Sequence, residues 1–454
     1  MRRNTLLLFV CLIVLGVRAY SQESQLAAEF RHESESFKKN CAKFSLKSIP
    51  GCGEVLFTGH PLHIAAGSIA PGNGFGVGPA FVTHYTPNEN WRLSFNADGI
   101  VSTNGSWRAG VYAKAIRTKI TPGTTTVRPY PIFNVYAQAA SLKKIAYYGL
   151  GPDTLRPDQT FFGMRETIAG ASVLYPVGGK PLNLSLHGEM NGRFVDIRES
   201  LGQPSPSIGQ VHTDATAPGL SSQPAFAQFG EGVRIRPGLF SDNLRLNYSV
   251  NYQQFVAVSD SRFSFQRLTV DLSHAIPLSK KVVEQSRDHN GPDDCSTSAT
   301  STTHDCPSIT RDRVGSINLR FLLVESFTST GHVVPFYFQP TLGGSDLNGR
   351  SSLASFQDYR FRAPNLMLLQ GGIEHSLYGP LGLTFMAETG KVALTRGDIE
   401  FKHLRHSYAA GLTLRAGGFP MVYLMLAWGS GEGTHTIASM NTSLLGGSSR
   451  PSLY

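Results

Sequence analysis

Two arginine–aromatic pairs lie close together in the last third of the chain, where residues 352–365 read SLASFQDYRFRAPN. The pairs are Tyr359-Arg360 and Phe361-Arg362. A guanidinium group binds a carboxylate through two parallel hydrogen bonds, so this stretch offers the chemistry of ion pairing. An apolar run suited to lipid, LMLLQGGIEHSL, follows almost directly. The arginines therefore need a polar surrounding that the apolar run does not supply.

Two glutamates follow the arginines on segments in which apolar and polar residues alternate. Glu374 alternates with Ile373 and Leu377, and Glu388 alternates with Phe385 and Ala387. Successive side chains of a strand point to opposite faces, so both acids lie on the polar face. We expect them to pair with nearby guanidinium groups. The alternative is that both acids are simply solvated.

Four cysteines follow the N-terminal region, and they form two pairs with ten residues between partners, in CAKFSLKSIPGC and CSTSATSTTHDC. These disulfide candidates are Cys41, Cys52, Cys295 and Cys306. In an oxidising compartment, pairing within each segment is the simplest arrangement, and cross-pairing stays open. The spacing is too long for a zinc knuckle, so a zinc site is not favoured.

No recognisable pattern of catalytic residues occurs. The chain contains neither a Gly-x-Ser-x-Gly nucleophile elbow nor a His-Glu-x-x-His metal motif. The pairs His60/His63 and His403/His406 are three residues apart, a spacing that forms no metal-binding face on strands or loops. We expect no enzyme activity, no metal site and no cofactor.

The N-terminus and the composition indicate an exported membrane protein. Arg2 and Arg3 precede a short apolar run and a sequence like a cleavage site, so residues 1–19 are predicted to be a signal peptide. No run of about 18 apolar residues, the length of a membrane-spanning helix, occurs elsewhere. The 454 residues include 47 Gly and 27 Phe but only 16% charged residues, which is typical of a transmembrane β-barrel.

The formal net charge of +9 suggests a polyanionic partner at first. No basic run supports nucleic-acid binding, and the chain is expected to be exported. In a barrel, many arginines would lie in the polar interior, which explains the charge without such a partner.

Alternation with a period of two is the main secondary-structure signal from residue 62 onward. In residues 244–252, LRLNYSVNY, one face carries Leu, Tyr and Val and the other carries Arg, Asn and Ser. Strands of soluble sheets are usually about five or six residues long, whereas a tilted strand needs about ten to cross a bilayer. Since the alternating segments are of the longer kind, we predict an all-β fold, a transmembrane antiparallel β-barrel.

The predicted barrel has about 16 strands, with the usual uncertainty at their ends. They fall near 62–70, 74–86, 91–103, 107–120, 127–148, 161–176, 182–196, 224–237, 244–257, 262–276, 313–327, 366–378, 381–390, 406–416, 419–428 and 434–445. An even number lets an antiparallel sheet close without leaving an unsatisfied edge in lipid.

Loop lengths predict the orientation of this barrel. If the chain starts in the periplasm, the periplasmic connections are short and the long ones are external, as is the rule for outer-membrane barrels. The exception is the polar insert 277–312, which is predicted to be periplasmic. The predicted divisions are a signal peptide 1–19, a short periplasmic segment 20–60 with the first cysteine pair, the barrel 61–446 and a tail 447–454.

Three stretches in the last third occur in a characteristic order: PFYFQPTLGGSDLN, SFQDYRFR and GLTFMAETGKV. Together they resemble the BamA/TamA superfamily of outer-membrane barrels, also called bacterial surface antigens. In that family an external loop with a Gly-Gly pair and an L/V-R-G-F/Y motif folds back into the lumen, and each of the next two strands carries an inward acid. The resemblance implies that 328–365 is this plug loop and that Glu374 and Glu388 are the acids. The implied plug-loop residues are Gly343, Gly344, Arg350, Phe356, Tyr359, Arg360 and Arg362.

Two of the departures from the family pattern bear on function. Ala354 stands where the motif has its arginine, for which Arg350, Arg360 or Arg362 could substitute. The POTRA repeats that receive substrates in many members do not fit into residues 20–60.

The resemblance implies a role in outer-membrane biogenesis, by insertion or translocation of a polypeptide at the plug loop and at the seam between the first and last strands. The implied partners are outer-membrane lipids and an unfolded outer-membrane protein or a translocated polypeptide. The two departures favour the alternative, a passive pore or structural barrel without insertase activity. A soluble exported β-protein would be recognised by membrane fractionation.

Overall fold

The computed structural model describes residues 25–41, 61–88, 90–117, 131–178, 181–200, 202–237, 244–285, 307–416 and 419–440. The predicted signal peptide, the predicted tail and three of the four disulfide candidates, Cys52, Cys295 and Cys306, lie outside these residues. Cys41 is the last residue of the helix α2. The cysteine pairing therefore stays a prediction.

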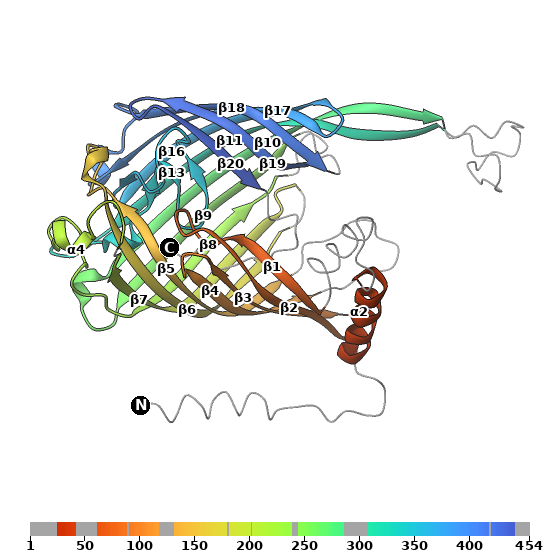
Figure 1. The fold of residues 1–454 in the computed structure, drawn as a ribbon, viewed down its shortest axis with the longest axis horizontal. Coiled ribbons are helices and arrows are strands. Elements are labelled where there is room, and N and C mark those ends of the chain that lie inside the picture. The colour runs from red at the N-terminus through yellow and green to blue at the C-terminus, as the bar shows by residue number, and fades with distance from the viewer. Residues whose placement is uncertain are drawn as a thin grey trace, which may run out of the picture.

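One antiparallel sheet of 16 strands dominates the fold, and each strand pairs with the next long strand along the chain (Figure 1). Each predicted segment overlaps one of these strands, so the predicted all-β fold and its strand number are confirmed. The strands are β1 (Leu62–Ser68), β2 (Phe75–Asn88), β3 (Trp91–Ser102), β4 (Trp107–Arg117), β5 (Ile132–Tyr147), β6 (Thr160–Pro176), β7 (Leu184–Glu199), β8 (Phe226–Ile235), β9 (Arg245–Ala257), β10 (Phe265–Gln285), β11 (Pro307–Phe327), β16 (Asn365–Tyr378), β17 (Leu381–Ala393), β18 (Arg405–Ala416), β19 (Phe419–Gly429) and β20 (Thr434–Met440).

Short elements complete the fold. Two helices and four 3-10 turns lie in the described residues: α2 (Gln25–Cys41), α4 (Ile208–Val211), and turns at Arg156–Asp158, Ser261–Phe263, Phe336–Phe338 and Arg396–Asp398. None of the described helices is long and apolar enough to span a membrane. Four two-residue strands form two small ladders: β12 (Thr341–Leu342) with β15 (Phe361–Arg362), and β13 (Gly344–Ser345) with β14 (Ser351–Ser352).

The β10–β11 hairpin is longer than the alternation indicated. The two strands stay paired as far as Gln285 and Pro307, well into the polar region 277–312 that was expected to be an insert. Antiparallel pairing satisfies backbone groups whatever the polarity of the side chains, so polar composition alone does not end a strand. Figure 1 shows this hairpin extending beyond the rest of the sheet.

The two faces of the sheet differ in kind. On β16, Leu369 and Ile373 are 44% and 42% exposed, whereas Glu374 beside them is buried. Opposite residues in the β16–β17 register share a face, so Ile373 and Phe385 lie together on the exposed side. We call this exposed apolar side the outward face and the side of Glu374 the inward face. The predicted alternation is therefore present, with the acid on the predicted side.

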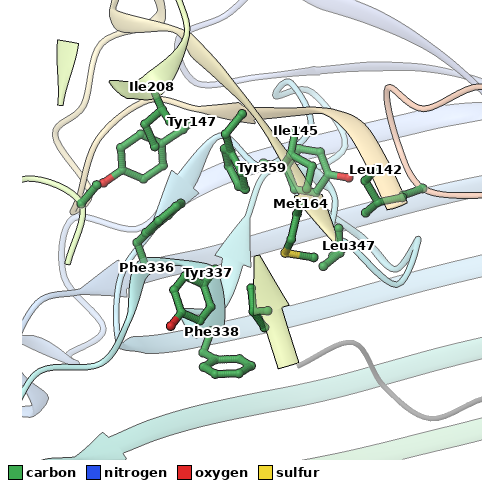
Figure 2. Packing of buried hydrophobic residues seen from close by; sticks show 14 of the residues in the cluster. Leu142, Ile145, Tyr147, Met164, Ile208, Phe336, Tyr337, Phe338, Leu347 and Tyr359 are labelled. Atoms are coloured by element: carbon green, nitrogen blue, oxygen red, sulfur yellow. The ribbon is translucent and has the colours of Figure 1, made fainter. Parts of the chain in front are cut away.

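The hydrophobic core lies on the inward face. Its centre is the aromatic triplet Phe336, Tyr337 and Phe338 between β11 and β16, which is fully buried. The Phe336 ring packs edge-to-face on Tyr147 of β5, with ring centroids 5.3 Å apart, and on Phe162 of β6, at 5.1 Å. Because the triplet forms a 3-10 turn, its rings point in different directions and reach several strands (Figure 2). A loop segment thus supplies the centre of the core.

Replacing Phe336 by alanine is expected to lower the free energy of unfolding by about 3–5 kcal/mol, because the cavity left between Tyr147 and Phe162 cannot collapse. Urea unfolding in detergent micelles measures this value. Phe401→Ala is the matched control, since Phe401 is 72% exposed and its loss should change the value by less than about 0.5 kcal/mol. Equal effects of the two substitutions would contradict the packing described.

Candidate functional site

The segment between β11 and β16, residues 328–364, is the candidate functional site, and we call it the long loop. Its two small ladders fold it back on itself, and its apolar side chains pack on the inward face. Leu342, Leu353 and Phe356 form one buried cluster with Leu368 of β16 and Val392 of β17. The Phe356 ring also packs edge-to-face on Phe361 at 5.3 Å. The long loop is therefore part of the folded core.

The glycine pair lets the two legs of the long loop touch. Gly343 and Gly344 have φ angles of +102° and +61°, which favour glycine. A Cβ on Gly343 would lie 2.7 Å from the Cβ of Arg360, and one on Gly344 would lie 2.5 Å from the backbone nitrogen of Asp358. No side chain fits at either distance, so this approach of the legs requires both glycines.

Asp358 joins the two legs of the long loop by a hydrogen bond. Its Oδ1 accepts a hydrogen bond of 2.8 Å from the backbone N–H of Ser345. Burial raises the pKa of the Asp358 carboxyl above its ordinary value, and the hydrogen bond opposes that rise.

Glu388 of β17 holds the middle of the long loop through the backbone. Its Oε2 accepts a hydrogen bond of 2.7 Å from the N–H of Ala354, and its Oε1 accepts one of 2.6 Å from Nε2 of Gln370. The neighbouring N–H of Ser355 donates to Oγ of Ser407 at 2.8 Å. Ala354 thus contacts the acid through its backbone and not through its side chain.

The structure differs here from the expected pairing of Glu388 with a guanidinium group. In the part of the chain that the structure describes, no arginine forms an ion pair with Glu388. The reason is that both oxygens of this buried carboxylate already accept hydrogen bonds from Ala354 and Gln370.

Glu374 of β16 is paired with an arginine from outside the long loop. Its Oε1 lies 2.5 Å from Nη1 of Arg415 on β18, and the same oxygen accepts a weaker bond from Thr413. Both charged side chains are buried on the inward face. The acid is therefore paired across β17, with an arginine two strands away in the sheet.

Arg360 joins the long loop to two connections that are distant in the sequence. Its guanidinium forms a buried ion pair with Glu432 between β19 and β20. It also donates to Oγ1 and the carbonyl oxygen of Thr154 between β5 and β6, at 2.8 and 2.6 Å. The guanidinium carbon lies 4.8 Å from the ring centre of Tyr148 and 4.5 Å from that of Phe361. Burial raises the pKa of Tyr148 to about 12, so this ring stays neutral beside the cation.

Tyr359 reaches the opposite edge of the sheet. Its hydroxyl donates a hydrogen bond of 3.1 Å to the carbonyl oxygen of Pro71, between β1 and β2. Two adjacent residues of the long loop therefore contact both the first and the last connections of the 16-stranded sheet. The sheet must curl for this to occur.

The other two arginines have different surroundings. Arg362 donates through Nη1 to the carbonyl oxygen of Phe336 at 2.7 Å and so ties the aromatic triplet to the return leg. Arg350 lies exposed beside the tip of the β13–β14 ladder, where its backbone N–H donates to Oδ1 of Asp346.

Some important residues were not identified from the sequence. Arg193 and Glu166 form a buried ion pair of 3.1 Å across β7 and β6, and only their inward position in the alternation indicated it. Glu432 lies in the turn GSGEG, where no periodicity exists to assign a face. The aromatic triplet was included only in the stretch that resembles the family, and its burial was not predicted. Its apolar side chains are themselves a signal for burial.

No protein-family model matches the chain, and a search of curated proteins finds no match. Solved structures similar to it include CdiB from Acinetobacter baumannii (12% identity, TM-score 0.46), BamA from Haemophilus ducreyi lacking POTRA domains 1-3 (10%, 0.48) and CdiB from Escherichia coli (10%, 0.49). The matches cover 81%, 84% and 83% of this chain and 56%, 69% and 61% of those chains, respectively. This chain therefore spans little more than half the length of the first. At these identities and TM-scores the likeness identifies no activity.

Gly344→Ala is expected to loosen the long loop, whereas Gly349→Ala is the matched control. Both glycines have positive φ, but a Cβ at Gly349 meets nothing within 4 Å. The control should therefore cost only the conformational penalty of about 1–2 kcal/mol. Gly344→Ala adds the clash with Asp358, so thermal unfolding should begin earlier and proteases should cut residues 345–360 faster. If the two variants behave alike, the close approach of the legs is not required.

Proposed function

We propose that the chain spans the bacterial outer membrane as a β-barrel whose lumen is closed by the long loop, and that it inserts or translocates polypeptides. The membrane part of the proposal is supported by the outward face. Large apolar side chains remain exposed there along nearly every strand, far beyond the patches that soluble monomers expose. They include Phe75, Val77, Phe95, Val111, Phe133, Val135, Met190, Phe194, Phe229, Val250, Leu319, Leu369, Ile373, Leu383, Phe385, Leu412, Leu424, Leu426 and Trp428.

The inward face has the opposite character, which suits a lumen. Among the described strand residues, three ion pairs lie on it: Arg193–Glu166 at 3.1 Å, Arg320–Asp271 at 2.8 Å and Arg415–Glu374 at 2.5 Å. Charged pairs inside and apolar side chains outside are the arrangement of outer-membrane barrels. Alternate side chains of each long strand would thus contact lipid on the outward face and polar groups on the inward face.

The long loop favours a closed lumen over a permanently open pore. Its aromatic triplet packs on strands from β5 to β10, and its Tyr359-Arg360 pair contacts the connections β1–β2 and β19–β20. A segment held by both apolar packing and a buried ion pair does not leave the lumen without losing both. We infer that it acts as a plug whose release is a regulated step.

The observation that carries the polypeptide-handling role is the pair of short edge strands beside this plug. In the described residues β1 and β20 are seven residues long and each pairs with only one neighbour. An unpaired strand edge presents backbone donors and acceptors to an extended chain, which can bind as an added strand. A nascent barrel strand or a translocated polypeptide is such a chain.

The second candidate is a barrel that keeps the fold without insertase activity, and Ala354 favours it. The arginine expected in the family motif is absent, and Glu388 is held by a backbone N–H. A competing anion can displace a carboxylate from a guanidinium group. The hydrogen bond between the backbone N–H of Ala354 and Glu388 involves no cationic side chain that such an anion could bind.

Charge reversal at the Arg360–Glu432 pair tests the plug. Wild-type protein in planar lipid bilayers should show little conductance. Arg360→Glu and Glu432→Arg should each open the lumen, because removing one partner of a buried pair costs about 3–5 kcal/mol. The double variant Arg360→Glu/Glu432→Arg restores opposite charges and should return conductance toward the wild-type value. A wild-type conductance equal to that of the single variants would contradict the closed lumen.

Removal of the protein from its bacterium tests the biogenesis role. Other barrels should then decline in the outer-membrane fraction, and expression of the wild-type chain should restore them. The Phe401→Ala variant, altered at an exposed loop position, should restore them equally well. Unchanged levels of all other barrels would favour the second candidate.

A further inference from the structure

We propose that α2 lies in the headgroup boundary of a phospholipid leaflet, with its phenylalanine side chains among the acyl chains, beside the first residue of β1. This inference rests on the proposed membrane span of the sheet. Phe30 and Phe37 of α2 are 39% and 46% exposed. They are seven residues apart, and at about 100° per residue this spacing places both on one face of the helix. A helix in water gains nothing from two exposed phenylalanines on the same face.

The position of α2 on the sheet identifies what this face meets. The rings of Phe30 and Phe81 of β2 have centroids 6.5 Å apart. Phe81 alternates with Ala80, which is buried on the inward side, and shares its parity with the exposed Phe75 and Val77. α2 is therefore packed against the outward face, the one placed in lipid. The lipid that would surround Phe81 would therefore also contact the exposed side of Phe30.

A hydrogen bond fixes the helix beside the first edge of the sheet. Oε2 of Glu33 accepts a bond of 3.1 Å from the backbone N–H of Leu62, the first residue of β1. A backbone N–H at an edge in contact with lipid would otherwise be unsatisfied, at a large free-energy penalty. α2 thus supplies an acceptor for an edge strand that lacks a second neighbour in the described residues.

The charges on α2 are arranged on opposite sides of the apolar stripe. Glu33 lies on the side that contacts β1, whereas Arg31 and Lys38, again seven residues apart, lie on the other side, where Lys39 and Glu35 follow further round the helix. Long basic side chains beside an apolar stripe reach phosphate groups while their stems stay in apolar surroundings. This asymmetry fits a phospholipid surface on the side of the helix that faces away from the sheet.

Tryptophan quenching by lipids with brominated acyl chains tests the proposal in proteoliposomes of the full chain. Phe37→Trp places the probe on the proposed lipid side, and His32→Trp places it about 140° away around the same helix, on the opposite side. Both positions are exposed, so neither variant should disturb folding. The three native tryptophans, Trp91, Trp107 and Trp428, belong to the strands and give the same background in every sample.

We expect bromine to quench most of the fluorescence added by Phe37→Trp and little of that added by His32→Trp. Aqueous iodide should show the reverse order. Equal quenching of both probes by iodide, with none by bromine, would overturn the inference. A Phe37→Trp probe that is protected from iodide but not quenched by bromine would place a protein surface over α2 and would also overturn it.

The wild-type protein separates this inference from the proposed function. Its native tryptophans lie on membrane-spanning strands, so bromolipids should quench them without any substitution. If they are quenched and the Phe37→Trp probe is not, α2 lies away from the membrane but the spanning sheet stands. If the native tryptophans are not quenched, the proposed membrane span fails.

Discussion

A buried arginine that joins the long loop to the last connection of a long sheet and to the connection β5–β6 constrains this structure more than any other single residue. Arg360 and Glu432 are 4% and 6% exposed at their side chains, so neither charge is hydrated. Charges that lose water must be paired and hydrogen-bonded, and each partner depends on the other. The connection β19–β20, the connection β5–β6 and the long loop must therefore lie close together, at the same end of their strands. With Tyr359 bonded to Pro71, the connection β1–β2 is drawn to the same place.

Apolar packing provides the stability that this ion pair requires. The triplet Phe336 to Phe338 fills the inward side between strands that are far apart in order, and Arg362 ties it to the return leg. Gly343 and Gly344 then allow the legs to close to backbone contact. The long loop consequently behaves as a core element. Its release would expose aromatic rings and unpaired charges together, which makes a closed state the stable one.

The strands could be predicted from sequence because two different surroundings impose a period of two on them. The apolar side chain of Leu369 predicts an outward position and the charged side chain of Glu374 an inward one, and the structure has both. The pairing of β16 with β17 is consistent with this alternation. The partner of Glu388 could not be predicted in the same way, because every residue carries a backbone N–H and Ala354 therefore leaves no signal in its side chain. The partner of Arg360 was missed for a related reason, since Glu432 lies in a glycine-rich turn without alternation. Polar composition likewise hid the extension of β10 to Gln285, because its pairing uses backbone groups alone.

Hydrogen–deuterium exchange of the membrane-embedded protein tests the central claim most directly, namely that the long loop is docked on the inward face. The backbone N–H groups of Gly343, Ala354 and Ser355 donate to side chains of Ser352, Glu388 and Ser407 and are buried. The account predicts that peptides covering 341–362 exchange as slowly as the neighbouring strands β16 and β17. Exchange as fast as that of the exposed connection 396–403 would contradict it.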